Sequence, residues 1–281
     1  MAWVPAHQVV GDPAARRWAF VLHGILGSGQ NLRVLARRLA QELPEWAFVL
    51  VDLRNHGESR GAAAPHTLAA CAADLEAVAD VLPRRPTVAI GHSFGGKVAL
   101  VWGAAAEAAG RRVDAVWALD VPPGTPDGPI EGTSEVVRVV RALRAVQTPL
   151  PRRDSIVAIL VDKGFSPALA QWMTTNLRAT DAGFVWRFDL DAVEAMLRDY
   201  AATSAWPWLE DPARRARVDV LRGGRSDRWS DAELARFVGP PRLALHLLPD
   251  AGHWVHVDDP DGLLRVLVAG LRPLAGGDAP T

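Results

Sequence analysis

Short apolar runs and helical periodicities alternate along the first 123 residues of the chain. Nearly continuous apolar runs predict strands that are buried on both faces, at residues 18–22, 47–51, 87–90 and 115–119. Between these runs, apolar residues recur at helical spacing, from about Asn31 to Pro44 and from Thr67 to Pro83. This alternation predicts a parallel sheet with right-handed crossover helices.

The pattern changes after Pro123. Helical patterns dominate the next stretch, at residues 134–146, 155–163, 166–177 and 191–200. Strand-like runs return at residues 218–221 and 243–248, and a last helix is expected from 259 to about 271. We therefore predict a core formed by residues 1–123 and 208–281, with a helical lid inserted between strands at residues 124–207. Helical decoration without a gating role is the alternative interpretation of the insertion.

A Gly-His-Ser-Phe-Gly sequence follows the third predicted strand directly, at residues 91–95. A G-x-S-x-G pattern between a strand and a helix is typical of a nucleophile elbow. The sharp turn strains the serine, so the residues two positions before and after it must lack bulk. We predict that Ser93 presents its hydroxyl at the carboxyl end of the sheet. Such a serine needs a base, an acid and an oxyanion hole.

Composition excludes several classes of partner. Lysine and arginine number 31 against 32 acidic residues, so no net charge favours nucleic acid, and no basic run suggests a membrane surface. No uninterrupted apolar segment reaches the roughly 18 residues of a spanning helix, and residues 1–13 lack the features of a signal peptide. The single Cys71 excludes an internal disulfide and fits a reducing compartment. We expect a cytoplasmic protein.

The motifs together resemble the α/β-hydrolase fold and, within it, the YbfF-like esterase branch. The segments that carry the resemblance are HGILGSGQNLRVLARRL (23–39), VDLRNHGES (51–59), GHSFGGK (91–97), LDVPP (119–123), WRF (186–188), GGRS (223–226) and AGHWVHVDDP (251–260). The resemblance implies a mostly parallel sheet flanked by helices. It also implies hydrolysis of carboxylic esters or acyl-thioesters of small to medium acyl chains, without a cofactor.

The resemblance also suggests partners for Ser93. His253, in a Gly-His loop after the last predicted strand, stands where the family has its base. Most members place the acid after the penultimate strand, where this chain has Asp227. The YbfF-like branch places it after the strand that follows the nucleophile, at Asp120, and usually has no acid at the position of Asp227. We favour Asp120 and retain Asp227 as the alternative.

By position in the family, the backbone N–H groups of Phe94 and Ile25 would form the oxyanion hole, with Leu26 as the fallback. The other histidines are not expected to act as the base. His92 is expected to point away from Ser93, and His23 to pack under the oxyanion loop. His56 is expected to be structural and His256 to lie at the surface.

Substrate contacts are less visible in the sequence. Four tryptophans could line an apolar acyl pocket or pack in the core: Trp172, Trp186, Trp206 and Trp208. Five arginines could meet the phosphates of an acyl-CoA or form solvated helix faces: Arg138, Arg141, Arg144, Arg152 and Arg153. The histidines and carboxylates show no H-E-x-x-H or similar metal spacing, so we expect neither a metal nor a cofactor.

The sequence thus predicts a serine hydrolase that acts on a small-molecule ester or thioester through an acyl-enzyme. Two alternatives stay open. One is other chemistry on the same fold, namely C–C bond hydrolysis or cofactor-free peroxidation. The other is a ligand receptor without turnover, because a fold does not by itself imply a function.

Overall fold

A seven-stranded sheet forms the centre of the computed structural model, which describes residues 3–125 and 135–275. The strands are β1 His7–Gly11, β2 Arg17–Leu22, β3 Trp46–Val51, β4 Val88–His92, β5 Ala115–Leu119, β8 Arg217–Gly223 and β9 Leu243–Leu248. They lie in the order β1-β3-β2-β4-β5-β8-β9, and every neighbouring pair is parallel except β1 with β3. The predicted α/β class and mostly parallel sheet are confirmed.

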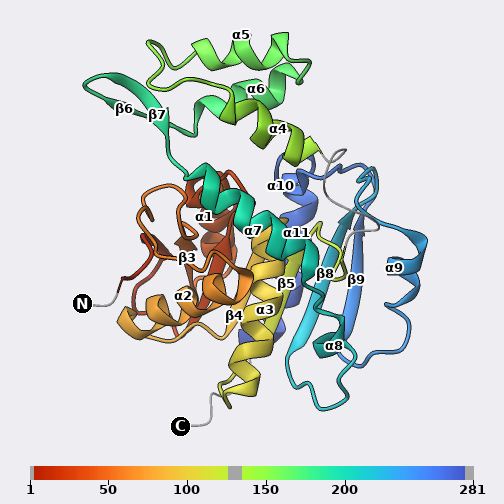
Figure 1. The fold of residues 1–281 in the computed structure, drawn as a ribbon. Helices are drawn as coiled ribbons and strands as arrows, with labels where there is room; N and C mark the ends of the chain where they lie inside the picture. Colours follow the sequence, from red (N-terminus) through yellow and green to blue (C-terminus); the bar gives the residue numbers. More distant parts are fainter. Residues whose placement is uncertain (1–2, 126–134, 276–281) are drawn as a thin grey trace.

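Helices cover both faces of this sheet, as Figure 1 shows. The long helices of the core are α1 Arg33–Glu42, α2 Leu68–Val81, α3 Phe94–Ala108 and α11 Pro260–Ala275. The pair α2 and α3 packs on one face, and the pair α1 and α11 on the other. In β2, Phe20 packs in the first layer and Val21 in the second, and both are fully buried. Burial on both faces is why the strand sequences are continuously apolar.

Shorter helices connect the main elements: η1 Gly29–Leu32, α8 Trp206–Leu209, α9 Asp231–Ala235 and α10 Val255–Asp258. The sequence also predicts some helix ends correctly. The Thr67 side chain accepts a hydrogen bond from the N–H of Ala70 at the start of α2. Such a cap satisfies one of the unpaired N–H groups of the first turn. Among the described residues, no helix combines the length and apolar character needed to cross a membrane.

The segment between β5 and β8 forms a smaller body, which we call the cap (residues 135–202). Its elements are α4 Glu135–Arg144, α5 Ser155–Asp162, α6 Pro167–Thr174, β6 Leu177–Thr180, β7 Gly183–Trp186 and α7 Leu190–Ala202. In Figure 1, α4 to α6 and the β6–β7 hairpin stand away from the sheet, and α7 runs back over the core. The predicted helix start at Ser134 lies outside the described residues.

The β6–β7 hairpin adds two short strands, which the sequence did not predict, to an otherwise helical insertion. Gly183 begins β7 with a φ of +127°, and a Cβ there would lie 2.4 Å from the carbonyl oxygen of Leu150. Only glycine fits this approach, so the turn depends on it. The strand β1 also escaped prediction, because an edge strand of five partly exposed residues has no continuous apolar run.

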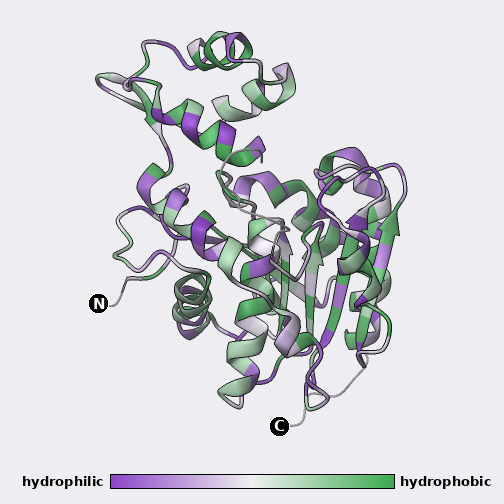
Figure 2. Cartoon of the chain, turned by 45° about the vertical axis from the view of Figure 1, so that its right-hand side comes forward, coloured by the Kyte–Doolittle hydropathy of each residue, from purple (hydrophilic) through white to green (hydrophobic). Residues whose placement is uncertain are grey.

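The cap has its own apolar cluster, which includes Val139, Leu143, Ile156, Leu160 and Met173. In Figure 2 the cap helices carry both hydrophobic and hydrophilic residues, as amphipathic helices do. Helix α7 joins cap and core, since its Leu197 packs in the cap cluster and its Met196 packs with Cys71 of α2. Helix α7 is therefore one of the elements through which the cap packs on the core.

The buried Lys97 of α3 contacts both ends of the segment that carries the cap. Its Nζ donates to the carbonyl oxygens of Gly124, 2.5 Å away, and Tyr200, 3.3 Å away. The ammonium also lies 4.3 Å from the centre of the Tyr200 ring. Burial lowers the pKa of Lys97 to about 8. One side chain of α3 thus joins the chain entering the cap to the end of the last cap helix.

Candidate active site

Ser93 occupies the sharp turn between β4 and α3, with a φ of 53° and a ψ of −119°. A Cβ at Gly91 would lie 2.1 Å from the carbonyl oxygen of Gly95. A Cβ at Gly95 would lie 2.4 Å from the carbonyl oxygen of His23. Both positions therefore require glycine, which is the packing that the sequence pattern predicts for a serine held in this turn.

Three side chains from distant parts of the chain form a hydrogen-bonded row. The Ser93 hydroxyl lies 3.1 Å from Nε2 of His253 and can donate to it. On the other side of the ring, Nδ1–H donates to Oδ2 of Asp120 over 2.7 Å. Ser93 follows β4, Asp120 follows β5 and His253 follows β9. They meet because parallel strands end at the same edge of the sheet.

Asp120 is the most heavily bonded of the three. Its carboxylate also accepts from Oγ of Ser226 at 2.6 Å, from the N–H of Gly223 at 2.9 Å and from Nε1 of Trp229 at 3.0 Å. Burial works to raise its pKa, but the hydrogen bonds from His253, Ser226 and Gly223 outweigh burial and lower it. Asp120 therefore carries a negative charge beside the imidazole.

Asp227 is placed differently. Its side chain is 94% exposed, and its carboxylate lies 3.6 Å from the guanidinium of Arg228 instead of contacting His253. The loop after β8 turns Ser226 and Trp229 towards Asp120 and leaves the side chain of Asp227 exposed to solvent. The structure brings Asp120, and not the alternative Asp227, to the histidine.

The three proposed oxyanion donors differ in whether their N–H groups already have an acceptor within the protein. The N–H of Leu26 donates to Nε2 of His56 over 3.2 Å, so the fallback donor is already engaged. For the N–H groups of Ile25 and Phe94, no acceptor is found among the described residues. Ile25 and Phe94 also line the same cavity as Ser93. These two groups are thus available to an oxygen of a bound ligand.

A cavity of about 700 Å³ lies between the core and the cap, with Ser93 and His253 in its wall. The cap contributes apolar side chains from three helices, including Val139 of α4, Leu169 of α6 and Leu197 of α7. Polar side chains, including Asn31, Glu135 and Arg138, complete the lining, and a concave site that combines apolar surface with polar groups is typical of a small-molecule pocket.

The chain matches the model of the alpha/beta hydrolase family over residues 19–266. It belongs to this family. It is 30% identical over 259 residues to the sn-1-specific diacylglycerol lipase ABHD11 of Mus musculus, covering 88% of this chain and 78% of that protein. It is 28% identical over 251 residues to esterase YbfF of Escherichia coli, covering 88% of this chain and 90% of that protein.

Solved structures agree with this assignment at the level of the fold. The structure of a marine microorganism esterase matches with a TM-score of 0.80 and 23% identity, covering 95% of this chain and 99% of that chain. The predicted resemblance to YbfF-like esterases is confirmed. Relatives named as esterases and lipases support an ester hydrolase.

Of the tryptophans predicted to contact substrate, only Trp172 lines the cavity of this hydrolase, where it packs edge-on against Trp254 at 4.9 Å. Trp186 stacks on Phe188 within the cap. Trp206 is buried in the core. Its Nε1 donates to Glu233, and Nε1 of Trp208 donates to Glu107. These three indoles pack within the cap or the core, and none of them lines the cavity.

The arginines that could meet a phosphate are mostly engaged elsewhere. Arg144 pairs with Asp191 and Glu194 of α7, and Arg152 pairs with Asp154. Nη1 of Arg153 donates to the carbonyl of Thr174. Arg138 lines the cavity of the hydrolase, with its guanidinium over the ring of Phe165. Among residues 3–125 and 135–275, no three potential ligands converge to hold a metal ion.

His92 and His256 lie beside the hydrogen-bonded row, and one of the two departs from its expected position. His92 points away from Ser93 as predicted, and its Nε2–H donates to the carbonyl of His253 over 2.8 Å. His256 was expected at the surface, and that expectation is wrong. Helix α10 folds it back against His92, with 4.8 Å between the ring centres, and it lines the cavity of the hydrolase. Burial lowers the pKa of His256 to about 4.

The sequence reasoning missed the residues that support Asp120. Ser226 lies within the GGRS segment that carried the family resemblance, so the sequence could have indicated a role for its hydroxyl. Trp229 lies in no motif, and only the fold reveals that its indole N–H reaches Asp120.

Proposed function

We propose that this chain is a serine hydrolase that cleaves carboxylic esters or acyl-thioesters of small to medium acyl chains through an acyl-enzyme. The observation that carries the proposal is the hydrogen-bonded row Ser93–His253–Asp120, whose Ser93 and His253 line a cavity to which the cap adds apolar side chains. Geometry of this kind identifies a nucleophile, its base and the group that orients the base, whatever their order in the chain.

In the first step, Oγ of Ser93 attacks the acyl carbonyl carbon while Nε2 of His253 takes the hydroxyl proton. A free serine hydroxyl is a weak nucleophile, and the adjacent base overcomes this. Asp120 holds the Nδ1–H of His253 and stabilises the imidazolium that forms. The carbonyl oxygen becomes an oxyanion, which the N–H groups of Ile25 and Phe94 are placed to receive. One such donor contributes roughly 10²–10³ in rate.

The tetrahedral intermediate then collapses. The bond from carbon to the leaving oxygen or sulfur breaks, and the leaving group takes the proton from Nε2 of His253. Water next attacks the acyl-enzyme, giving a proton to the same nitrogen. The acid product leaves and Ser93 regains its proton, so the cycle consumes only ester and water.

The cavity supports the proposed acyl range. Its volume of about 700 Å³ falls within the range typical of small-molecule sites. Val139, Leu169 and Trp172 of the cap provide apolar surface for an acyl chain. Because the cap supplies these side chains, we propose that it acts as a lid that selects the acyl group.

A fluorophosphonate probe tests the nucleophile. We expect stoichiometric labelling of the purified protein, located by peptide mass spectrometry to Ser93. The variant S93A should not label, whereas S204A, a serine outside the cavity wall, should label like the parent. Undiminished labelling of S93A would overturn the proposal. Turnover of p-nitrophenyl butyrate and butyryl-CoA would then separate ester from thioester preference.

A further inference from the structure

Two histidines outside the catalytic row join the two loops that flank it. We call residues 23–28 the oxyanion loop and residues 52–67 the β3–α2 loop. Nε2 of His23, in the first loop, accepts from the N–H of Leu53 in the second over 2.9 Å. Nε2 of His56, in the second loop, accepts from the N–H of Leu26 in the first over 3.2 Å. Each loop thus provides one imidazole and one N–H group to the other.

Both rings must be neutral and share one tautomer. Nδ1 of His23 faces the carbonyl of Gly24 at 2.7 Å, and Nδ1 of His56 faces the carbonyl of Arg54 at 2.9 Å. A carbonyl only accepts, so each Nδ1 carries the hydrogen; a backbone N–H only donates, so each Nε2 is bare. The rings are buried with 5.3 Å between their centres, and burial favours the uncharged form.

The hydrogen bond that the Leu26 N–H donates to His56 fixes an unfavourable backbone conformation. Gly27 N–H donates to the carbonyl of Gly24 over 3.1 Å, which closes a turn around Ile25 and Leu26. Leu26 has a φ of +62°, at a position where turns of this sort usually have glycine. Its N–H is held by His56 while its side chain packs in the cap cluster. Holding the peptide of Leu26 also sets the direction of the neighbouring Ile25 N–H.

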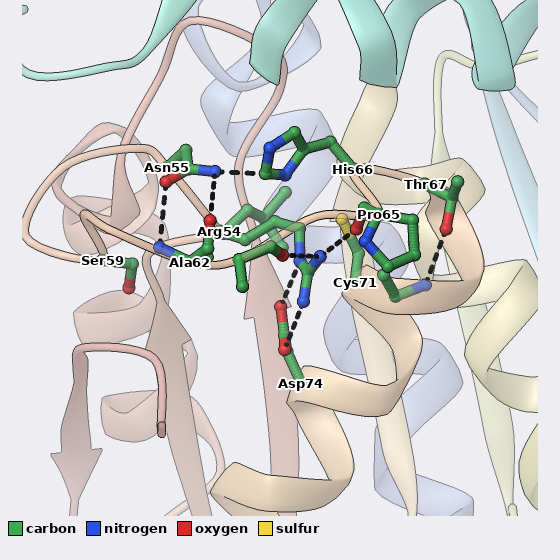
Figure 3. A network of polar contacts seen from close by, with 12 residues as sticks. Arg54, Asn55, Ser59, Ala62, Pro65, His66, Thr67, Cys71 and Asp74 are labelled. Atoms are coloured by element: carbon green, nitrogen blue, oxygen red, sulfur yellow. Dashed lines mark hydrogen bonds and ion pairs between the residues drawn. The ribbon is translucent and has the colours of Figure 1, made fainter. Parts of the chain in front are cut away.

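Polar contacts within the β3–α2 loop and to α2 hold the two residues that precede His56, and Figure 3 shows these contacts for Arg54 and Asn55. Arg54 binds Asp74 through two hydrogen bonds of 2.7 and 2.9 Å and also reaches the carbonyl of Pro65. The Asn55 side chain bonds Ala62 in both directions. These ties hold the backbone around His56 in place.

We propose that His23 and His56 are positioning residues that aim the Ile25 N–H at the oxyanion of the substrate. The inference rests on the proposed function and deepens it. It explains why a leucine is kept in a left-handed conformation beside the nucleophile, and why the Leu26 N–H faces a nitrogen acceptor instead of the cavity.

The cap contacts the same β3–α2 loop. The N–H of Asp189 donates to the carbonyl of Asn55 over 3.1 Å, and Phe188 lies against the His56 ring at 6.4 Å. Arg187 pairs with Glu58 over 2.9 Å. The cap therefore contacts the loop whose His56 holds the Leu26 N–H.

Substitutions of His56 that differ in reach test the proposal. Oε1 of glutamine can take the place of Nε2 and accept from Leu26, whereas the shorter asparagine cannot. We expect H56N and H56L to lower kcat for p-nitrophenyl butyrate about 10- to 100-fold with KM changed less than about threefold, as fits a misaimed oxyanion donor. H56Q should stay within about fivefold of the parent.

A second readout separates positioning from general loss of structure. Amide hydrogen exchange should show the Leu26 N–H protected in the parent and in H56Q but exchanging faster in H56N. The control H246L removes a histidine that contacts Asp219, remote from the cavity wall, and should leave kcat unchanged even if it lowers Tm.

Equal kcat in H56N and H56Q would overturn the positioning role, and so would equal Leu26 protection. Because this pair differs by one methylene, it decides the matter even if H56L fails to fold. Absence of both turnover and probe labelling in the parent would overturn the proposed function and this inference together. Activity in the parent with no difference between the variants would overturn this inference alone.

Discussion

The core and the cap meet at the cavity but are built differently. Four of the five non-glycine residues with positive φ in the described chain lie at the catalytic edge of the core: Leu26, Asn55, Ser93 and Asp120. None lies in residues 135–202. Each such conformation costs on the order of 1–3 kcal/mol and persists only where its surroundings fix it. In the core, strained backbone conformations held by hydrogen bonds therefore place a few atoms at this edge of the sheet.

The cap contributes side-chain surface. Its residues at the cavity belong to regular helices and are mostly apolar, with Glu135 and Arg138 as charged exceptions, and its strands β6 and β7 are mostly only partly buried. The difference suggests a division of labour in which the core determines the chemistry and the cap determines the fit of the substrate. The predictions below test that division, beginning with the largest effect.

The variant S93A should lose the most activity. Removal of the nucleophile leaves only the oxyanion donors and binding, so kcat for a p-nitrophenyl ester should fall by about 10⁴–10⁶. The cap and its contacts are untouched, so Tm should stay close to that of the parent. Retained turnover in S93A, measured on protein free of contaminating esterase, would place the chemistry elsewhere.

The paired variants D120N and D227N should differ widely. Asp120 bonds His253 from a buried site, and loss of such an orienting carboxylate can cost up to about 10⁴ in kcat. Asp227 is exposed and pairs with Arg228 instead of His253, so D227N should remain within about twofold of the parent. Steady-state kinetics on one ester would measure both. A comparable loss in the two variants would contradict the assignment of the acid.

The variant W172A should change substrate preference more than chemistry. Trp172 lines the cavity from α6, so its truncation should lower kcat/KM for hexanoyl esters about 5- to 20-fold and for acetyl esters far less. W186A is the matched control, since Trp186 lies in the cap but stacks on Phe188 outside the cavity. If W172A reduced acetyl and hexanoyl turnover alike, the cap would act on chemistry and the division would fail.

Lowering the pH should reduce the free energy of unfolding. Burial lowers the pKa of His23 to about 4, and burial with the nearby His23 lowers that of His56 to about 3 despite the charge of Asp52. The unfolded chain binds protons near pH 6.5, so between that pH and about 4 it holds more protons than the folded protein. Stability is therefore full above about pH 6.5 and falls as the pH decreases.

Urea unfolding at pH 7.0, 5.5 and 4.5 would measure this loss. H56Q removes one of the titrating groups while keeping an acceptor for Leu26, so its midpoint should fall less steeply. His92 and His256 have lowered pKa values as well, so the dependence should be reduced and not abolished. A slope unchanged in H56Q would show that His56 does not contribute.

Sequence predicted the core well because parallel strands buried on both faces carry a continuous apolar signal. The sequence also predicted the turn at Ser93 well, since backbone contacts require glycine at positions 91 and 95. The choice between Asp120 and Asp227 rested on the family resemblance alone, which favoured Asp120. Both follow predicted strands at the same edge, and only the direction of each side chain decides which one meets His253.

The cap was less predictable for a physical reason. Its hairpin depends on the approach of Gly183 to Leu150, a contact between residues far apart in the sequence. The tryptophans posed the same difficulty, because an indole that fills the core and one that faces a ligand have the same local pattern. Trp206 and Trp172 differ only in which elements fold around them.

The buried ammonium of Lys97 has a consequence for exchanging parts between relatives. Because it binds the carbonyl oxygens of Gly124 and Tyr200, a foreign cap must supply two correctly spaced backbone acceptors as well as a matching surface. A chimera that carries only the segment between those two residues keeps the native anchor. A junction cut deeper into the core would leave a cation in the interior without its partners. The nucleophile helix thus sets the boundaries within which substrate selection can be redesigned.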